Sequence, residues 1–415
     1  MMNFKKPELL APAGSLDKLK TAFLYGADAV YIGGEAYSLR VAAENFSFSE
    51  MEEGVRYAHS IGKKVYLTAN IIPHNKDVAE YREFLKEAVR TGIDAIIISD
   101  LGLFSVTKEI APDLDVHIST QANNVNYEAC KMWHRLGAKR VIIARELSFN
   151  EISEIRRNTD DDLEIEAFVH GAMCISYSGR CLLSNYMTER DSNQGACSHP
   201  CRWNYSLVEE TRPGEYFPVY ENERGTFIYN SKDLCMIEHI DKLIECGLTS
   251  FKIEGRVKTE YYLATVVKAY RDAIDSYFES IEAGRVYTFD TSLLDELKKV
   301  SHRDYTTGFY FKKPTGTEQN YQTSSYIRNY ELLGIVDGYD EDKKLISVIQ
   351  KNRFFVGDEV EFLCPEGPYK KLKITEILDK ENNKIEVANR PQQIVRLYSE
   401  IPIEKGSMMR GKKTQ

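Results

Sequence analysis

The residues best suited to chemistry in this chain are four cysteines that lie in one segment. Cys174, Cys181, Cys197 and Cys201 fall within 28 residues, with six, fifteen and three residues between them, and they are half of the eight cysteines in the chain. Thiolates gathered in this way bind a metal or pair as disulfides. Which of the two they do decides what kind of function the protein has.

The spacing of the cysteines favours one kind of metal site but leaves others open. A structural zinc site commonly has two short C-x2-4-C hooks, and only Cys197 and Cys201 are that close in the sequence. Iron–sulfur clusters are held at longer and more varied spacings. We therefore expect an iron–sulfur cluster, with zinc and redox-active or inert thiols as the alternatives. Cys235 is a further candidate ligand, although its sequence context is that of a helix residue packed in the core.

Composition narrows the choice between a metal and disulfides. The chain has 415 residues, of which 43% are hydrophobic and 28% charged, as in an ordinary globular protein. We find no run of eighteen apolar residues and no apolar signal segment at the N-terminus, so we expect a cytoplasmic protein without a membrane segment. Disulfides are rare in the cytoplasm.

The net charge of -9 argues against general DNA binding and leaves open an RNA enzyme with a local basic face.

The elements that must position the cysteines form a repeating pattern. Short β-branched runs alternate with amphipathic helical segments, which favours parallel strands joined by right-handed crossovers. Eight such strands predict an α/β fold, a (β/α)8 barrel like that of triosephosphate isomerase over residues 1–285, with an open doubly wound sheet as the alternative. The expected strands lie at 8–14, 28–34, 64–70, 94–100, 115–121, 140–146, 164–171 and 250–256.

The remaining segments are predicted from changes in this pattern. Residues 172–232 read as an insertion after the seventh strand that holds the cysteines and a hairpin. Apolar and polar residues alternate over 321–410, with turn signals between the runs, which predicts a small all-β barrel domain. The other expected segments are a helix at 233–247, a closing helix at 259–281, a connector at 286–320 and a disordered basic tail at 411–415.

Polar residues at the ends of the predicted strands are candidates for the site, because barrel enzymes place function there. Glu166 and Glu254 are candidate acids or bases, and the arginines of the cysteine segment could offset a cluster's charge or bind an anionic substrate. The candidates at the strand ends are Arg40, Asn70, Gln121, Asn123, Arg145, Glu146, His170, Lys252, Glu254 and Arg256, and those of the cysteine segment are Arg180, Arg190 and Arg202.

Several long motifs resemble one known family. The segment EAFVHGAMCISYSGRCLLS at 166–184 resembles the signature of the collagenase-like peptidase family, peptidase family U32. The blocks at 11–34, 117–126 and 230–256 also resemble that family, so the resemblance covers nearly the whole chain. It implies a small β-barrel appended to the larger domain, as the alternation in the last hundred residues predicts.

The resemblance also implies a function and a cofactor. The cysteine segment most resembles a branch of the family implied in oxygen-independent hydroxylation of the wobble uridine in the tRNA anticodon loop, with prephenate as the hydroxyl donor. Relatives hold a 4Fe-4S cluster on four cysteines, which correspond here to Cys174, Cys181, Cys197 and Cys201, with Cys235 as the alternative last ligand. Because some relatives work as pairs, a paralogous partner chain is also implied.

Three functions from different classes follow from these observations. The hydroxylase interpretation assigns catalysis to His170, Glu166, Glu254 and Lys252. Substrate binding falls to Arg40, Gln121, Asn123, Arg145, Arg180, Arg190, Arg202 and Arg256, and base stacking to Tyr177, Tyr186 and Trp203. A cysteine peptidase would pair Cys174 with His170, although no HExxH or GxSxG motif is present. The third alternative is a non-catalytic iron–sulfur subunit.

Overall fold

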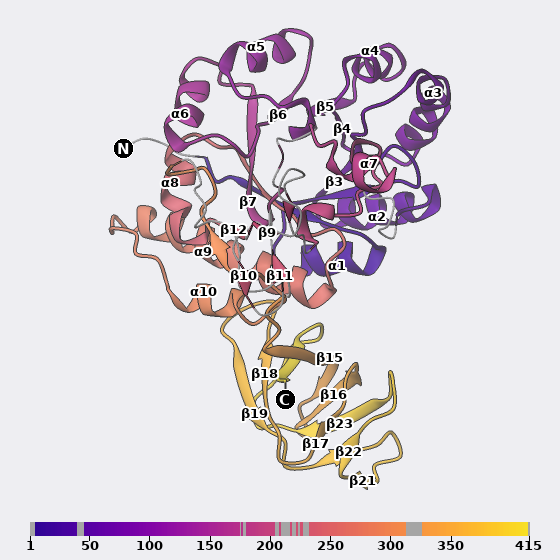
Figure 1. The fold of residues 1–415 in the computed structure, drawn as a ribbon. Helices are drawn as coiled ribbons and strands as arrows, with labels where there is room; N and C mark the ends of the chain where they lie inside the picture. Colours follow the sequence, from indigo (N-terminus) through magenta and orange to yellow (C-terminus); the bar gives the residue numbers. More distant parts are fainter. Residues whose placement is uncertain are drawn as a thin grey trace.

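The computed structural model describes residues 5–39, 45–174, 176, 180–203, 207–208, 216–217, 221–222, 225–226, 232–312 and 326–413. Its larger part is a closed ring of eight parallel strands surrounded by helices (Figure 1). The strand β13 (Ser250–Ile253) pairs in parallel with both β1 (Glu8–Pro12) and β7 (Glu164–Ala172), and this closes the ring. The predicted (β/α)8 barrel is therefore confirmed, and the open sheet is excluded.

The other barrel strands follow the predicted runs closely. Each is short and almost wholly buried, as expected for parallel strands covered on both faces. They are β2 (Ala29–Gly33), β3 (Lys64–Ala69), β4 (Ala95–Ile98), β5 (Asp115–Ile118) and β6 (Arg140–Ile142).

Helices begin where the sequence provides a cap. The side chains of Ser15, Ser47, Asp100, Asn126 and Ser148 each accept a hydrogen bond from a backbone N–H of the first turn, which satisfies a donor that the helix leaves unpaired. The helices around the barrel are α1 (Leu16–Leu24), α2 (Phe48–Ser60), α3 (Asn75–Arg90), α4 (Leu101–Ile110), α5 (Tyr127–Arg135), α6 (Phe149–Arg157), α8 (Ile240–Glu245) and α9 (Glu260–Glu282). The predicted closing helix is thus confirmed as α9.

The helix predicted at 233–247 starts too early. Residues 233–235 form the strand β12 (Asp233–Cys235), which pairs antiparallel with the last residues of β7 and parallel with β14 (Tyr305–Thr306). The reason is that β7 is nine residues long and extends past the barrel, so its end has backbone groups left to pair. The helix α8 begins only after this strand and a short 3-10 turn.

The insertion between β7 and β12 contains the cysteines and little regular structure among its described residues. It includes the short helix α7 (Leu183–Thr188) and two short antiparallel ladders. Their strands are β8 (Leu207–Val208), β9 (Tyr216–Phe217), β10 (Glu221–Asn222) and β11 (Gly225–Thr226).

The C-terminal part is an antiparallel half-barrel with its own core. Its eight-stranded sheet has the order β19-β18-β24-β15-β16-β23-β20-β21. The strands are β15 (Tyr330–Asp340), β16 (Leu345–Gln350), β18 (Glu359–Leu363), β19 (Lys370–Lys373), β20 (Ile377–Leu378), β21 (Lys384–Ile385), β23 (Ile394–Tyr398) and β24 (Met408–Lys412), with β17 (Phe354–Phe355) and β22 (Val387–Ala388) as a separate pair. This confirms the predicted all-β domain, although its sheet has two edges.

The expectation of a disordered basic tail is wrong for residues 411 and 412. They belong to β24, which is hydrogen-bonded between β15 and β18. Arg410 in this strand is fully buried, and its guanidinium pairs with Glu361 at 3.0 Å and with Glu296 of α10 (Ser292–Leu297). Two carboxylates therefore compensate the buried charge, and the pair with Glu296 joins the half-barrel to α10.

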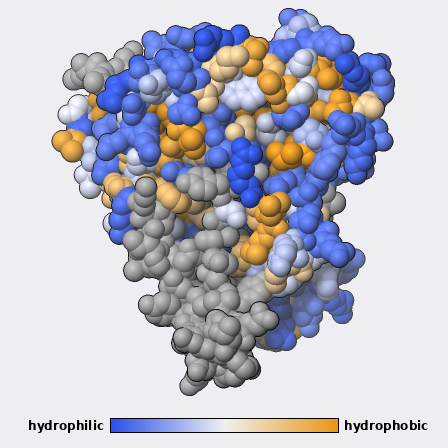
Figure 2. All heavy atoms as spheres, turned by 45° about the horizontal axis from the view of Figure 1, so that its top comes forward, coloured by the Kyte–Doolittle hydropathy of each residue, from blue (hydrophilic) through white to orange (hydrophobic). Residues whose placement is uncertain are grey.

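None of the helices among the described residues is long and apolar enough to cross a membrane. The face drawn in Figure 2 is mostly hydrophilic, with separate hydrophobic groups between the charged residues.

Candidate active site

A cavity of about 240 Å³ lies at the C-terminal ends of the barrel strands. Residues from the rim and from the cysteine segment line it together, so the structure gathers residues that are far apart in the chain. The predicted candidates that line the cavity are Asn70, Gln121, Arg145, Glu146, Lys252, Glu254, Arg256, Cys174, Cys181, Cys197 and Cys201.

Hydrogen bonds hold the cysteine segment against the rim. The Ser192 hydroxyl and the Asn193 side-chain amide both donate to the Cys181 carbonyl oxygen, at 2.9 and 3.1 Å. The Asn193 carbonyl accepts from the Ile72 backbone N–H at 3.0 Å, and the Gln194 amide donates to the Ile72 carbonyl oxygen. The segment is thereby fixed to the loop that follows β3.

The four predicted ligand cysteines line one cavity together. No disulfide joins any of the eight cysteines. A single zinc bound at about 2.3 Å requires its sulfur ligands to lie no more than about 4.6 Å apart. Among the described residues, the only three ligand atoms of this kind within 4.8 Å of one another belong to His134, Asp160 and Asp162. The four thiols therefore share one cavity without three of them closing around a single ion, and soft thiolates gathered in this way could hold an iron–sulfur cluster.

Two of the thiols have shifted acidities. Burial raises the pKa of the Cys174 thiol. Burial also opposes ionisation of Cys181, but hydrogen bonds from the Ser176 hydroxyl, the Leu183 backbone and the Ser192 hydroxyl outweigh it and lower the pKa of that thiol. The Cys197 sulfur accepts a hydrogen bond from the His199 backbone N–H at 3.4 Å. Such donors around the sulfurs stabilise thiolates.

Cys235, the alternative fourth ligand, lies elsewhere. It is buried in β12 opposite His170 and does not line the cavity. Burial raises the pKa of its thiol to about 12. Its surroundings are those of a core residue, whereas Cys201 lines the same cavity as the other three cysteines.

Arg145 connects the ends of two strands at the cavity wall. Its guanidinium donates to the Ala172 carbonyl oxygen at 2.8 Å and to the Glu254 carboxylate at 2.9 Å. It also lies 3.8 Å from the centre of the Phe168 ring. Arg145 is thus held in one orientation, with its charge paired to Glu254.

Arg256 is buried on the other side of the rim, where its guanidinium donates to the Thr68 hydroxyl at 3.0 Å. Gly33 at the end of β2 leaves the space that this guanidinium occupies, because a Cβ there would lie only 2.7 Å from the Arg256 Cζ. The contact between Gly33 and Arg256 could not be predicted from the sequence, because the two positions are 223 apart in the chain.

Glu166 lies beneath the cavity floor and is fully buried. It accepts from Lys252 Nζ at 2.8 Å and from the Arg140 guanidinium at 2.9 Å. Lys252 in turn lines the cavity and lies 4.5 Å from the centre of the Tyr31 ring. Glu166 therefore holds Lys252 in place and is not among the residues that line the cavity.

The structure directs His170 away from the cavity. The pairing of β7 with β13 shifts register so that Phe168 faces Lys252 but His170 faces Ile253, which leaves Val169 as an extra residue. Such a bulge turns the following side chains to the other face of the sheet. The His170 ring lies among the rings of Tyr262, Tyr270 and Tyr305, and burial lowers its pKa to about 3.

Several other predicted residues are not gathered at the cavity. Arg180 and Arg190 are exposed and do not line it, nor does Asn123, which has a left-handed backbone with φ of 56°. Tyr186 and Trp203 are 86% and 43% exposed, so their rings are available for stacking and are not packed in the core. Arg40, Tyr177 and the side chain of Arg202 lie outside the described residues.

Lys258 and Tyr326 are among the cavity residues that the sequence did not single out. Lys258 follows the eighth strand by five residues, and the rule that function lies at strand ends should have included it. Tyr326 comes from the residues just before β15, and no sequence signal links it to the rim.

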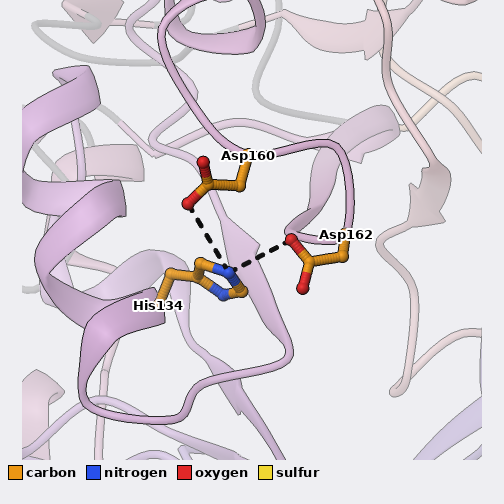
Figure 3. A group of neighbouring side chains, drawn as sticks. All are labelled: His134, Asp160 and Asp162. Atoms are coloured by element: carbon orange, nitrogen blue, oxygen red, sulfur yellow. Dashed lines mark ion pairs between the residues drawn. The ribbon is translucent and has the colours of Figure 1, made fainter.

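His134, Asp160 and Asp162 form a separate group of potential ligands (Figure 3). The His134 Nε2 lies 3.3 Å from Asp162 and 3.8 Å from Asp160, and both carboxylates are largely exposed. The group joins the end of α5 to the loop before β7, which places it at the opposite end of the barrel from the cavity. We interpret it as a surface ion pair.

Comparison with known proteins was made for the whole chain. The model of peptidase family U32 matches residues 14–320, and that of the peptidase family U32 C-terminal domain matches residues 328–410. The tRNA hydroxylation protein P1 of Bacillus subtilis is 43% identical over 406 residues, covering 98% of this chain and 95% of the relative. The tRNA hydroxylation protein P of Escherichia coli is 42% identical over 402 residues, covering 87% of each chain.

One solved structure is similar to part of the chain. The C-terminal domain of a putative U32 peptidase from Geobacillus thermoleovorans, as its selenomethionine variant, is 39% identical. It covers 19% of this chain and 98% of that domain, with a TM-score of 0.19.

Proposed function

Since the chain belongs to peptidase family U32, we propose that it is an RNA hydroxylase that depends on an iron–sulfur cluster and forms 5-hydroxyuridine at the wobble position of tRNA without oxygen. The observation that carries the proposal is the single cavity that four cysteines and the cations of the rim line together. The two relatives described above are named tRNA hydroxylation proteins, which supports this class of reaction.

Cys174, Cys181, Cys197 and Cys201 would hold a four-iron cluster. When bound, the cluster would supply redox and Lewis-acid chemistry at the cavity wall. The chain's own residues bind and orient the reactants. Glu166 anchors the Lys252 side chain at the floor, and Arg145 orients the Glu254 carboxylate.

The reaction exchanges the hydrogen at C5 of uridine for a hydroxyl group. The base is oxidised, and the donor, which loses its hydroxyl and gains the hydrogen, is reduced to the same extent. We propose prephenate as this donor and Glu254 as the group that accepts the C5 proton and passes it on. His170 has no part in this scheme, because it faces α9.

The size of the cavity and the exposed aromatic residues support an RNA substrate. A volume of about 240 Å³ is below the range of about 300–1,000 Å³ typical of drug-sized ligands, so it suits one base or one small acid. A wobble base in a single-stranded loop can be splayed out of the stack, and the exposed rings of Tyr186 and Trp203 could stack on it or its neighbours.

The peptidase alternative lacks support from the geometry. A cysteine peptidase needs a histidine beside its thiol. No hydrogen bond joins the His170 ring to Cys174, and the ring contacts tyrosines on the other side of β7. Its lowered pKa also makes it a poor base.

Nucleoside mass spectrometry tests the proposal. In a strain that lacks this gene and every related gene, 5-hydroxyuridine should be absent from tRNA and return with the wild-type chain but not with Cys174→Ser. The anaerobically purified holoenzyme should form it in vitro from prephenate and unmodified tRNA. Full modification in the deletion strain would refute the function, and activity of the chain alone would show that no paralogous partner is required.

A further inference from the structure

Lys258 stands at the junction of two cavities. The second cavity has a volume of about 1280 Å³ and lies between the barrel and the half-barrel. Val257, Lys258 and Tyr326 line both cavities, and no residue of the cysteine segment lines the second one among those described. A small molecule that enters through the second cavity would therefore reach Lys258 without crossing the cysteine segment.

The ammonium group of Lys258 is held in place from several sides. Its Nζ donates to the Ser301 carbonyl oxygen at 3.2 Å and lies 3.8 Å from the centre of the Tyr326 ring and 4.9 Å from that of Tyr262. The Tyr326 hydroxyl accepts a hydrogen bond from Arg303 at 3.2 Å. A lysine ammonium has three donors, and the Ser301 carbonyl uses one of them.

No carboxylate in the described part of the chain contacts the ammonium of Lys258 directly, and the Asp233 carboxylate, which acts on it from further away, is paired with Arg303. The guanidinium of Arg145 lies 2.9 Å from Glu254, and the ammonium of Lys252 lies 2.8 Å from Glu166. No carboxylate oxygen of the described residues lies within 4.0 Å of Lys258 Nζ. Burial also lowers the pKa of this lysine, as expected for an ammonium that lacks a close counter-ion. A preorganised cation of this kind is suited to bind an anion.

The charges of the second cavity favour a small anion over an RNA backbone. Its cations, Lys18, Lys258, Arg328 and Lys351, are matched in number by its carboxylates, Asp17, Glu50, Glu260 and Glu331. A surface that follows RNA phosphates needs an excess of positive charge. The lining of the second cavity as a whole has no excess of positive charge, so the unbalanced charge is local to Lys258.

We propose that Lys258 binds a carboxylate group of the small-molecule hydroxyl donor. This inference rests on the proposed function, since it assigns the donor site of that reaction. The ring of Tyr326 and the carbonyl of Ser301 act as positioning groups that aim the ammonium at the cavity.

The test compares Lys258→Met with a matched control, Lys351→Met, which removes an exposed lysine from the second cavity alone. In anaerobic assays of the holoenzyme, Lys258→Met should raise the KM for prephenate about 10- to 100-fold, because a charge-assisted hydrogen bond is lost. The KM for tRNA should not change. Lys258→Arg keeps the charge and should recover part of the affinity, and Lys351→Met should behave as wild type.

Equilibrium dialysis of prephenate against the resting holoenzyme separates this inference from the proposed function. If wild type binds prephenate and Lys258→Met does not, the result supports Lys258 as part of the donor site, even when no 5-hydroxyuridine forms. If wild type turns over but the variant keeps its prephenate affinity, the inference fails and the function stands. A rise in the KM for tRNA alone would assign Lys258 to an RNA phosphate and overturn the inference. If Lys258→Met does not fold, Tyr326→Leu, which removes the ring that positions the ammonium, should raise the KM for prephenate instead, and an unchanged KM would overturn the inference.

Discussion

Gly33 leaves the space in which the guanidinium of Arg256 lies. The two residues come from opposite ends of the barrel sequence, and a side chain at the first would overlap the second. Because Gly33 is not in the left-handed region, the constraint is one of space and not of backbone conformation. The position of Arg256 thus depends on a residue that has no functional group.

We predict that Gly33→Ala displaces Arg256 and lowers kcat/KM for hydroxylation about 10- to 100-fold, since a shift of about 1 Å in a positioning group has effects of this size. Steady-state assays would measure it. Gly338→Ala in β15 is the control, because a Cβ there meets nothing within 4 Å. Equal activity of Gly33→Ala and wild type would contradict the role assigned to this glycine.

The buried pair of Glu166 and Lys252 should contribute to the stability of the folded protein. Glu166→Gln leaves Lys252 and Arg140 with less compensation in a buried environment, which should lower the free energy of unfolding by about 3–5 kcal/mol. Urea denaturation would measure the change. Glu83→Gln, which breaks an exposed pair with Lys86, should leave the midpoint unchanged, and a similar loss in both variants would refute the argument.

The lowered pKa of His170 predicts a pH dependence of stability. The unfolded chain binds a proton at His170 near the ordinary pKa of 6.5, whereas the folded protein binds it only near pH 3. Below pH 6.5 the unfolded state therefore holds more protons, and stability falls as the pH falls, by about 1.4 kcal/mol per pH unit from this residue.

The comparison of wild type with His170→Leu isolates this contribution. The free energy of unfolding of the variant should fall less steeply between pH 6.5 and 4, and the two proteins should show parallel curves above pH 7. His117, which is buried and has a lowered pKa, contributes a similar slope to both. Parallel curves over the whole range would show that His170 does not have the shifted pKa.

Iron content tests the cysteine assignment. Anaerobically purified wild type should contain about four iron atoms per chain. Cys201→Ser should lose most of its iron and its visible absorbance, while Cys235→Ala should keep both, because Cys235 does not line the cavity. The reverse result would make Cys235 the fourth ligand, and a colourless, iron-free wild type would refute the cluster.

The order of the elements could be predicted from the sequence because each barrel strand is a short buried run between capped helices. All eight expected runs contain a strand of the ring. His170 shows where the pattern fails: one extra residue in β7 reverses the side-chain direction, and nothing in the local sequence marks it. Glu166 was expected at the site as a candidate acid or base, but it is buried outside the cavity lining, where it pairs with Lys252 and Arg140.

Contacts between distant segments could not be predicted at all. Tyr326 reaches the rim from the residues just before β15, and Arg410 is buried because Glu296 and Glu361 meet it from two domains. A basic segment such as 408–413 is typical of a solvated tail, and only the tertiary structure supplies the carboxylates that make burial of its arginine favourable.

The place of β24 in the sheet has a consequence for the order in which the protein is assembled. This strand is made after all the others of the half-barrel, yet it lies between β18 and β15 and not at an edge. A nascent chain that ends before residue 408 would therefore expose two unpaired strand edges and leave Glu296 and Glu361 without their arginine. The edges of β15 and β18 are covered only once the last strand has been synthesised. Prematurely terminated chains should therefore present these edges to proteases and chaperones, and full-length chains should not.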